Sequence, residues 1–402
     1  MAMRNINFFK TWVEIKQSNL IHNLSQFQKL IGPKTRFMAV VKANAYGHGL
    51  IEVSKIVIKN GADWLGVDSI DEALRLKQVG IKTPILILGY TLKSRLAEAI
   101  EHGFRLTVYN RETIEKLGEI QNSKFKNKSV NVHIKVETGT SRQGVLEKDV
   151  LDFVKLIKKY PYINIEGLSS HFANIEDTTD HRYAQKQLKT FRRIAQRLER
   201  NGIKIPLKHI ACSAATILFP ETHFDMVRVG ISIYGLWSSK ETLISVKNGS
   251  LVKQGTKIKK SFTALLQKFQ LRPVMTWKTK VAQVKKLKAG TPISYGLTER
   301  ISSDSRIAVL PVGYWDGYDR KLSSIGNVLI AGKRCKVLGR VCMNMIIVDV
   351  THIPNIKIED EVVLLGKQKN EEISADEIAQ KLGTINYEVV TRINPLLPRI
   401  VV

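Results

Sequence analysis

Eight short apolar runs recur along the first 245 residues of this 402-residue chain, and amphipathic stretches lie between them. The runs are Phe37–Val41, Trp64–Val67, Pro84–Leu88, Arg105–Tyr109, Val130–Val136, Ile163–Ser169, Lys208–Ala211 and Met226–Tyr234. Ile70–Val79, Leu151–Lys158 and Gln185–Asn201 have helical spacing, and Gly202 follows the last of them as a helix cap would. Eight strands that alternate with helices predict a (βα)8 barrel of the TIM type. An open doubly wound sheet is the alternative, but no glycine-rich dinucleotide fingerprint follows any run.

The pattern changes after about residue 245. Val246–Lys260 is typical of a connection or an insertion, and short strands then dominate. We expect these strands at Lys278–Val284, Arg306–Pro311, Val328–Ile330, Met345–Val350 and Val362–Leu365. One helix is expected at Ser374–Leu382, where Ser374 and Glu377 have capping-box spacing and Gly383 is the stop. The sequence therefore predicts a barrel over residues 13–245 and a C-terminal all-β domain over 246–402, joined by residues 1–12.

The net charge of +27 raises the question of a nucleic-acid partner. The basic residues are spread out, and no aromatics interleave with them as on a base-stacking surface, which favours a lysine-rich solvated surface. No stretch approaches the roughly 18 apolar residues of a membrane helix, and the N-terminus lacks the apolar core of a signal peptide. Cys212, Cys335 and Cys342 lack metal-site spacing and fit free thiols. We expect a cytoplasmic protein that binds no nucleic acid, membrane or metal.

The candidate chemistry lies where the apolar runs end. The carboxyl ends of barrel strands meet at one mouth, so these side chains would converge there. They are Lys42, Arg142, His171, Ser213, Arg228 and Gly230. A desolvated lysine has a lowered pKa and can form a Schiff base with a carbonyl, although Lys42 at a strand end can also be an ordinary surface cation. A phosphate-bearing aldehyde bound to Lys42 as a Schiff base would give each of these six residues a role. Its phosphate would lie among two hydroxyls and two backbone amides, those of Tyr46, Ser213, Gly230 and Ile231.

Nine segments carry a resemblance to a known family. They are Ala39–Gly49, Lys135–Gly144, Ser170–Ala173, Ser213–Thr216, Met226–Leu236, Ser294–Gly296, Pro311–Gly317, Gly339–Asn344 and Thr384–Val389. In this order they resemble the alanine racemases, fold-type III pyridoxal-phosphate enzymes with a barrel and a β domain. One segment alone is a weak signal, but the ordered set spans nearly the whole chain. The resemblance implies a pyridoxal 5'-phosphate-dependent racemase that interconverts L- and D-alanine and supplies D-alanine for peptidoglycan.

The resemblance also implies two bases, one on each face of the substrate. Lys42 is similar to the lysine that holds the cofactor and acts on D-alanine, and Tyr295 to the base that acts on L-alanine. A tyrosine with a pKa near its ordinary value of about 10 is a poor base at neutral pH, so it needs a neighbour that stabilises its anion. His171 matches the family histidine that contacts this tyrosine and is linked in turn to Arg228.

Arg228 matches the arginine that donates to the pyridine nitrogen of the cofactor. Arginine does not give up its proton, so that nitrogen would stay unprotonated and the carbanion short-lived, which favours racemisation over decarboxylation or transamination. Arg142 resembles the arginine that contacts the cofactor's phenolic oxygen and the substrate carboxylate. Lys135 matches a lysine that is carbamylated in many members, and a carbamate there would be an anion able to hold Arg142. Met343 matches a substrate contact from the partner subunit, so the resemblance implies a homodimer with shared active sites.

Four features depart from the family pattern. Glu137–Ser141 replaces the familiar Asp-Thr-Gly-Met-Gly, and Asn344 replaces an acid. Ser169 and Pro395 stand where many or some members have a tyrosine. None of these changes removes a catalytic group, but they concern the outer pocket. A racemase with a broader or serine-type substrate range is therefore the alternative, and a non-catalytic pyridoxal-phosphate carrier is a more distant one.

Overall fold

The computed structural model describes residues 8–126, 128–176, 179–247 and 260–402. Its internal contacts divide the chain into two compact units. The β unit comprises Met1–Asn19, Tyr46–Glu52 and Pro273–Val402, and the barrel unit comprises Leu20–Ala45 and Val53–Arg272. The expected connection at 246–260 falls mostly outside the described residues. The helix that follows it, α11 (Lys260–Gln267), groups with the barrel unit.

Eight parallel strands form the barrel. They are β2 (Arg36–Val40), β3 (Trp64–Val67), β4 (Ile85–Ile87), β5 (Arg105–Val108), β6 (Val130–Lys135), β7 (Ile163–Ser169), β8 (Leu207–His209) and β9 (Met226–Val229). Each pairs with its neighbour in the order β8-β7-β6-β5-β4-β3-β2-β9. The ends of this series also meet, because the backbone N of Asp225 donates to Lys208 O over 3.1 Å and that of Arg228 to Ala211 O over 3.0 Å. The predicted eight-stranded barrel is therefore confirmed.

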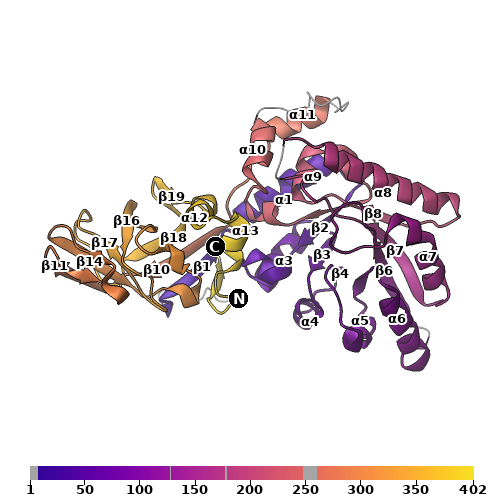
Figure 1. Cartoon of the computed structure of the whole chain (residues 1–402), viewed down its shortest axis with the longest axis horizontal. Coiled ribbons are helices and arrows are strands. Elements are labelled where there is room, and N and C mark those ends of the chain that lie inside the picture. The colour runs from indigo at the N-terminus through magenta and orange to yellow at the C-terminus, as the bar shows by residue number, and fades with distance from the viewer. Residues whose placement is uncertain (1–7, 127, 177–178, 248–259) are drawn as a thin grey trace. The chain divides into compact units, whose positions relative to one another are not determined.

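Helices separate the strands along the chain, and Figure 1 shows α4 to α8 around the outside of β3 to β8. The helices are α1 (Gln17–Ile31), α2 (Lys42–Tyr46), α3 (Leu50–Lys59), α4 (Ile70–Gln78), α5 (Leu96–His102), α6 (Arg111–Ser123), α7 (Val150–Lys158), α8 (Arg182–Arg200), α9 (Ser213–Leu218) and α10 (Lys240–Lys247). In α8, Leu188, Phe191 and Leu198 are buried at helical spacing, as predicted. Among the described residues, no helix combines the length and the apolar character needed to cross a bilayer.

The barrel interior is filled by side chains from several strands. One buried cluster brings together Met38, Trp64, Leu86, Leu207 and Met226. Such a layer makes the barrel a packed core, so its chemistry has to collect where the strands end.

The β unit is built on one large, mostly antiparallel sheet. Its strands are β1 (Thr11–Ile15), β10 (Met275–Lys280), β11 (Gln283–Leu287), β14 (Ser305–Leu310), β15 (Asn327–Ile330), β16 (Lys333–Leu338), β17 (Ile346–Asp349), β18 (Glu361–Gln368), β19 (Glu371–Ile373) and β20 (Arg399–Val401). The pair β12 (Pro292–Ile293) and β13 (Glu299–Arg300) stands apart from it. The N-terminal strand β1 lies between β10 and β20, so the start of the chain is part of this sheet.

One expectation for this unit was wrong in detail, and one helix was missed. The single strand expected at Lys278–Val284 is two strands, because the chain changes partner between them: Val281 N donates to Asp360 O, whereas Ala282 N donates to Val309 O. The expected helix is present as α12 (Ala375–Leu382), with Ser374 Oγ accepting from Glu377 N at 3.0 Å. A second helix, α13 (Asn386–Thr391), follows it and was not predicted.

Candidate active site

Lys42 follows strand β2 and opens a left-handed turn. The next four residues, Ala43 to Tyr46, have φ between 51° and 55°, a conformation that costs L-residues about 1–2 kcal/mol each. Fixed contacts hold this turn: Ala45 N donates to Val41 O over 2.7 Å, and Asn44 N donates to Glu72 Oε1 over 3.3 Å. Strain of this kind persists where the surroundings over-determine it, and it is common at functional sites.

An acidic side chain faces the lysine. Lys42 Nζ lies 3.2 Å from Asp68 Oδ1, and both side chains are open to solvent, so this ion pair contributes little to stability. Asp68 directly follows β3, and its backbone N donates to Glu72 Oε2 over 2.8 Å. Glu72 therefore joins the loops after β2 and β3. Neither acid was predicted; the position of Asp68 at a strand end was the available signal.

Lys135 ends strand β6 inside a cluster of cations. Burial, and then the charges of Arg228, Arg142 and Lys42, lower the pKa of Lys135 to about 7, while Glu137 opposes the shift. Four of the predicted residues therefore lie close enough for three of them to act electrostatically on the fourth, Lys135. It also means that a large fraction of the Lys135 amine is uncharged at neutral pH.

The loop that carries Arg142 is folded around Glu137. The Glu137 carboxylate accepts hydrogen bonds from the backbone N of Gly139, Thr140 and Arg142 at 2.5, 2.6 and 3.3 Å. Burial alone would raise the pKa of Glu137, but these bonds outweigh it and lower that pKa. The replacement of the family aspartate by Glu137 thus leaves an anchored loop, with the Arg142 side chain exposed.

Arg228 on β9 is buried and held by several acceptors. Its Nη1 donates to His209 Nδ1 at 2.6 Å and to His209 O at 2.9 Å, and its Nη2 donates to Ser170 O at 2.7 Å. Burial lowers the pKa of Arg228 to about 10, which still leaves it charged at neutral pH. His209, on β8, was missed because a polar residue within an apolar run resembles an ordinary strand residue.

His171 lies just after β7 and within reach of this arginine. Its Nδ1 is 3.4 Å from Arg228 Nη2. Burial, followed by the charges of Arg228 and Lys135, places the pKa of His171 well below its ordinary value, so the ring is neutral at physiological pH. Its backbone carbonyl accepts from Thr140 Oγ1 over 2.7 Å, which anchors the backbone that carries the ring.

Ser213 and Gly230 connect the loops after β8 and β9. Gly230 N donates to Ser213 Oγ over 3.0 Å, and both residues are buried. Ser213 begins α9, and Gly230 precedes the 3-10 turn Ile231–Tyr234. Burial raises the pKa of the neighbouring Cys212 to about 12, so that thiol stays protonated. A hydroxyl and backbone amides gathered at this end of the barrel suit an anionic group.

The remaining predicted residues belong to the β unit. Tyr295 and Met343 are 73% and 55% exposed, and Tyr314, within the family segment Pro311–Gly317, is 43% exposed. Tyr314 N donates to Cys342 O at 3.0 Å, next to Met343, and the Ser294 hydroxyl beside Tyr295 donates to Arg340 O at 2.6 Å. Three loops of one unit therefore present these exposed side chains together. Tyr46 also belongs to this unit, where its ring lies 6.1 Å from that of Tyr387.

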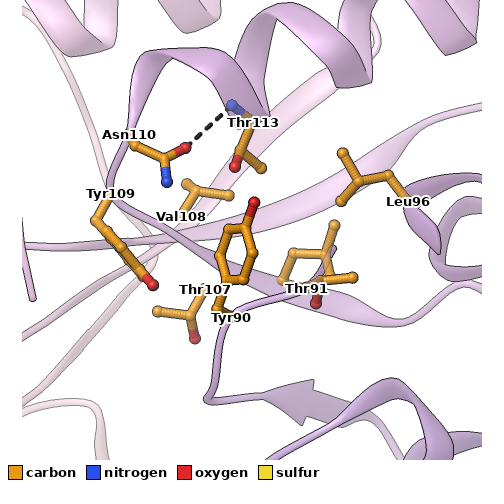
Figure 2. A pocket seen from close by; sticks show the side chains of 9 residues that line it. Tyr90, Thr91, Leu96, Thr107, Val108, Tyr109, Asn110 and Thr113 are labelled. Carbon is orange, nitrogen blue, oxygen red and sulfur yellow. Dashed lines mark hydrogen bonds between the residues drawn. The ribbon is translucent and has the colours of Figure 1, made fainter. Parts of the chain in front are cut away.

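A small pocket lies where β4 and β5 end, and Figure 2 shows its lining. It is a shallow depression lined by hydroxyl, amide and aliphatic side chains, including those of Tyr90 and Tyr109. Within the described residues, the buried hydroxyls of Thr91 and Thr107 have no hydrogen-bond partner. None of the predicted site residues lines this pocket, which is too small for a cofactor.

Comparison with known proteins gives matches over both units. The family model "Alanine racemase, N-terminal domain" matches residues 15–238, and "Alanine racemase, C-terminal domain" matches residues 274–401. The alanine racemase of Methanococcus maripaludis is 42% identical over 97% of this chain and 98% of its own length. That of Desulforamulus reducens is 40% identical over the same shares.

Solved structures agree with these matches. An alanine racemase from Clostridium difficile 630 is 34% identical, with a TM-score of 0.88 over 98% of this chain and 96% of its own. The alanine racemase from Bacillus anthracis, solved with bound L-Ala-P, is 33% identical, with a TM-score of 0.86 over 98% and 95% of the two chains.

Proposed function

The chain belongs to the alanine racemase family, and we propose that Lys42 and Tyr295 are the two bases with which it interconverts L- and D-alanine. The full-length relatives that it matches at 35–42% identity are alanine racemases, so the reaction class is that of an amino-acid racemase, an isomerase.

The residues of the barrel mouth fit pyridoxal 5'-phosphate. When bound, this cofactor withdraws electrons from the α-carbon of the substrate and makes its proton removable. Lys42 supplies the amine that holds it, and Arg228 supplies a charged donor for the ring nitrogen. Tyr46, Ser213, Gly230 and Ile231 would hold its phosphate. The Ser213–Gly230 hydrogen bond supports this set, because it already aligns a hydroxyl with a backbone amide of the next loop.

The proton transfers fall to a lysine and a tyrosine on opposite faces of the α-carbon. Lys42 takes the proton from D-alanine, and Tyr295 takes it from L-alanine; each returns a proton to the other enantiomer. His171 contacts Tyr295 in this proposal. Arg228 donates to His171 Nδ1, so the proton of the neutral ring is on Nε2, which can donate to the anion of Tyr295 without adding positive charge. Arg142 orients the substrate carboxylate, and Met343 forms part of the substrate contact.

Arg228 decides which reaction follows proton removal. A guanidinium is a donor without an acceptor, so with the cofactor bound it would leave the ring nitrogen unprotonated and limit the withdrawal of electrons. This weaker withdrawal would favour the return of a proton over decarboxylation and transamination.

Lys135 is carbamylated in this proposal. A neutral lysine amine adds to carbon dioxide and forms an N–C bond, and the nitrogen loses a proton to solvent, so an ammonium becomes an anion. The low pKa of Lys135 supports this reaction, because it supplies the neutral amine at physiological pH. The carbamate would pair with Arg142 and replace repulsion among cations by attraction.

The two units of this chain each carry part of the proposed chemistry, which fits a homodimer with shared active sites. In this proposal the enzyme is cytoplasmic and supplies D-alanine for peptidoglycan. Tyr295 and Met343 are exposed in the β unit, whereas Lys42 is in the barrel unit. The proposal includes no nucleic-acid or membrane partner. Within the described residues, no cluster of three or more potential ligands for a metal ion is found.

The observation that carries the proposal is that Lys135, half-buried at the end of its strand, lies close enough to Arg228, Arg142 and Lys42 for their charges to lower its pKa. The test is racemisation of a panel of single enantiomers, with pyridoxal phosphate added and Lys42→Ala as the inactive control. Alanine should be the best substrate. A faster reaction with serine would favour the alternative of a serine-type or broader range, for which the departures at Ser169, Asn344 and Pro395 leave room.

A further inference from the structure

A row of polar side chains crosses the inside of the barrel from Arg228. It contains one residue from each of five neighbouring strands: Arg228 on β9, His209 on β8, Glu166 on β7, His133 on β6 and Arg105 on β5. Arg228 Nη1 lies 2.6 Å from His209 Nδ1, and His209 Nε2 lies 2.8 Å from His133 Nδ1. His133 Nε2 lies 3.2 Å from Glu166 Oε2, which also accepts from Arg105 Nε at 3.3 Å.

The chemistry of the groups fixes the direction of every bond in this row. Arginine has no acceptor, so Arg228 donates and His209 Nδ1 accepts. The proton of His209 is therefore on Nε2, which donates to His133 Nδ1. The proton of His133 is then on Nε2, which donates to Glu166. Both imidazoles are neutral, in keeping with burial that lowers the pKa of each.

The series of hydrogen bonds that starts at Arg228 leads to the carboxylate of Glu166. Burial alone would raise the pKa of Glu166, but the bond from His133 and the charge of Arg105 outweigh it and lower that pKa, so Glu166 is ionised. Arg105 is itself held over the ring of Trp64, with its guanidinium carbon 5.2 Å from the ring centroid. Hydrogen bonds in series polarise one another, so the charge of Glu166 acts on Arg228 through two imidazoles.

The surrounding strands leave room for this arrangement. The rings of His133 and His209 are fully buried, with their centroids 5.1 Å apart. A Cβ atom on Gly167 would lie 2.2 Å from His133 Nδ1, so a larger residue there would displace the ring. The proposed racemisation mechanism uses only Arg228 of this row, and it gives no reason for the half-buried charge of Glu166, which two imidazoles separate from Arg228.

We propose that Glu166 and His133 are positioning residues that act through His209 to fix the orientation and donor strength of Arg228. The inference rests on the proposed function in one respect, namely that Arg228 faces the ring nitrogen of the cofactor. Neither residue touches that cofactor. Their effect is on the rate of the racemisation that Arg228 controls and on the absorbance of the bound cofactor.

Two substitutions test the row in the holoenzyme. Glu166→Gln keeps the shape of the side chain and removes its charge. His133→Asn keeps an acceptor near the position of Nδ1, for His209, but cannot reach Glu166. Each should lower kcat for alanine on the order of tenfold with little change in KM, as supporting partners do for metal ligands. Glu147→Gln is the control, since it breaks an exposed ion pair with Arg193 in the same unit and should leave kcat unchanged.

The double variant gives the decisive comparison. If both residues act through one row, Glu166→Gln together with His133→Asn costs no more than either change alone. Losses that multiply would show two independent structural effects and would overturn the proposal, as would unchanged kcat and cofactor absorbance in both single variants.

A second readout does not depend on activity. Nitrogen NMR of the histidine rings should show a proton on Nε2 and none on Nδ1 for His133 and His209 in the unaltered enzyme. A proton on His209 Nδ1 would contradict the row even if the enzyme is a fast racemase. Absence of racemisation in the unaltered enzyme would instead contradict the proposed function, with the row still decided by the NMR result.

Discussion

The hydroxyl of Ser213 accepts a hydrogen bond from the backbone N of Gly230 over 3.0 Å, and this bond joins the loops that follow strands β8 and β9. Both residues are buried, and both were predicted from the sequence as phosphate contacts. The bond means that the two loops form one preorganised surface, which lowers the ordering cost of binding an anion there.

Ser213→Ala should therefore weaken the binding of pyridoxal phosphate. Loss of one hydrogen bond to a charged group costs about 1.5 kcal/mol, which is roughly a tenfold increase in Kd. Titration of the apoenzyme with the cofactor, followed by absorbance, measures this change. Ser123→Ala is the matched control, because Ser123 is exposed at the end of α6. Equal affinity in both variants would remove Ser213 from the phosphate site.

Borohydride reduction should fix pyridoxal phosphate to the peptide that contains Lys42, because only a cofactor joined to an amine through a C=N bond is trapped in this way. Lys42→Ala should abolish the label. Lys55→Ala, a change at an exposed lysine on α3, should not affect it. Mass spectrometry of the digested protein identifies the labelled residue. A label on a different lysine in the unaltered enzyme would contradict the assignment of the barrel mouth.

Arg228→Glu should redirect the reaction from racemisation toward transamination. A carboxyl group at this position can share a proton with the cofactor's ring nitrogen, which prolongs the life of the negative charge at the α-carbon. The ratio of pyruvate formed to alanine racemised should rise, while racemisation slows. This ratio does not depend on how much of the variant is folded, which matters because the guanidinium is buried.

Arg228→Lys is the companion variant, since it keeps a cationic donor and should leave the ratio close to that of the unaltered enzyme. Unchanged partitioning in Arg228→Glu would mean that the arginine has a structural role alone.

Lys135 should make stability depend on pH in carbonate-free buffer. Its pKa is about 7 in the folded protein against an ordinary value of 10.5, so between these values the unfolded chain binds more protons. Stability with respect to this group therefore rises with pH across that window, and the full penalty is present below pH 7. Lys135→Met removes the penalty. Its Tm should exceed that of the unaltered protein most at pH 6, and the difference should shrink toward pH 10.

The exposed Lys155→Met is the control, for which we expect no such pH-dependent difference. With carbon dioxide present, the carbamate on Lys135 should be visible in electron density. A bare ammonium with a bound anion between it and Arg142 would refute the modification and leave the need for negative charge in place.

The barrel was predictable because its strands are marked twice, by apolar runs and by the helices between them. The positions of Lys42, Arg228 and Ser213 at or near the ends of barrel strands were predictable for the same reason, while their roles stay predictions. The break between β10 and β11 was not predictable, because it depends on a change of partner strand that the local sequence does not encode. His133, Glu166 and His209 were missed because each lies within a strand, where single polar residues do not show what they face.

The β unit presents a final test, since Tyr295 is exposed there while Lys42 belongs to the barrel unit. We predict a homodimer in which each active site takes Lys42 from one subunit and Tyr295 from the other. A two-fold axis makes both sites equivalent. Lys42→Ala and Tyr295→Phe proteins should each be nearly inactive, and each should be dimeric by light scattering.

Mixing the two inactive proteins distinguishes shared from unshared sites. With random exchange about half of the dimers are mixed, and each mixed dimer has one site with both defects and one site with neither, so roughly a quarter of all sites are intact. Activity should recover toward that fraction. The control for exchange itself is native mass spectrometry of the same mixture with one variant isotope-labelled, in which dimers of intermediate mass show that subunits have exchanged. If that control shows exchange and the mixture stays inactive, Lys42 and Tyr295 serve one subunit's site and the shared arrangement is wrong.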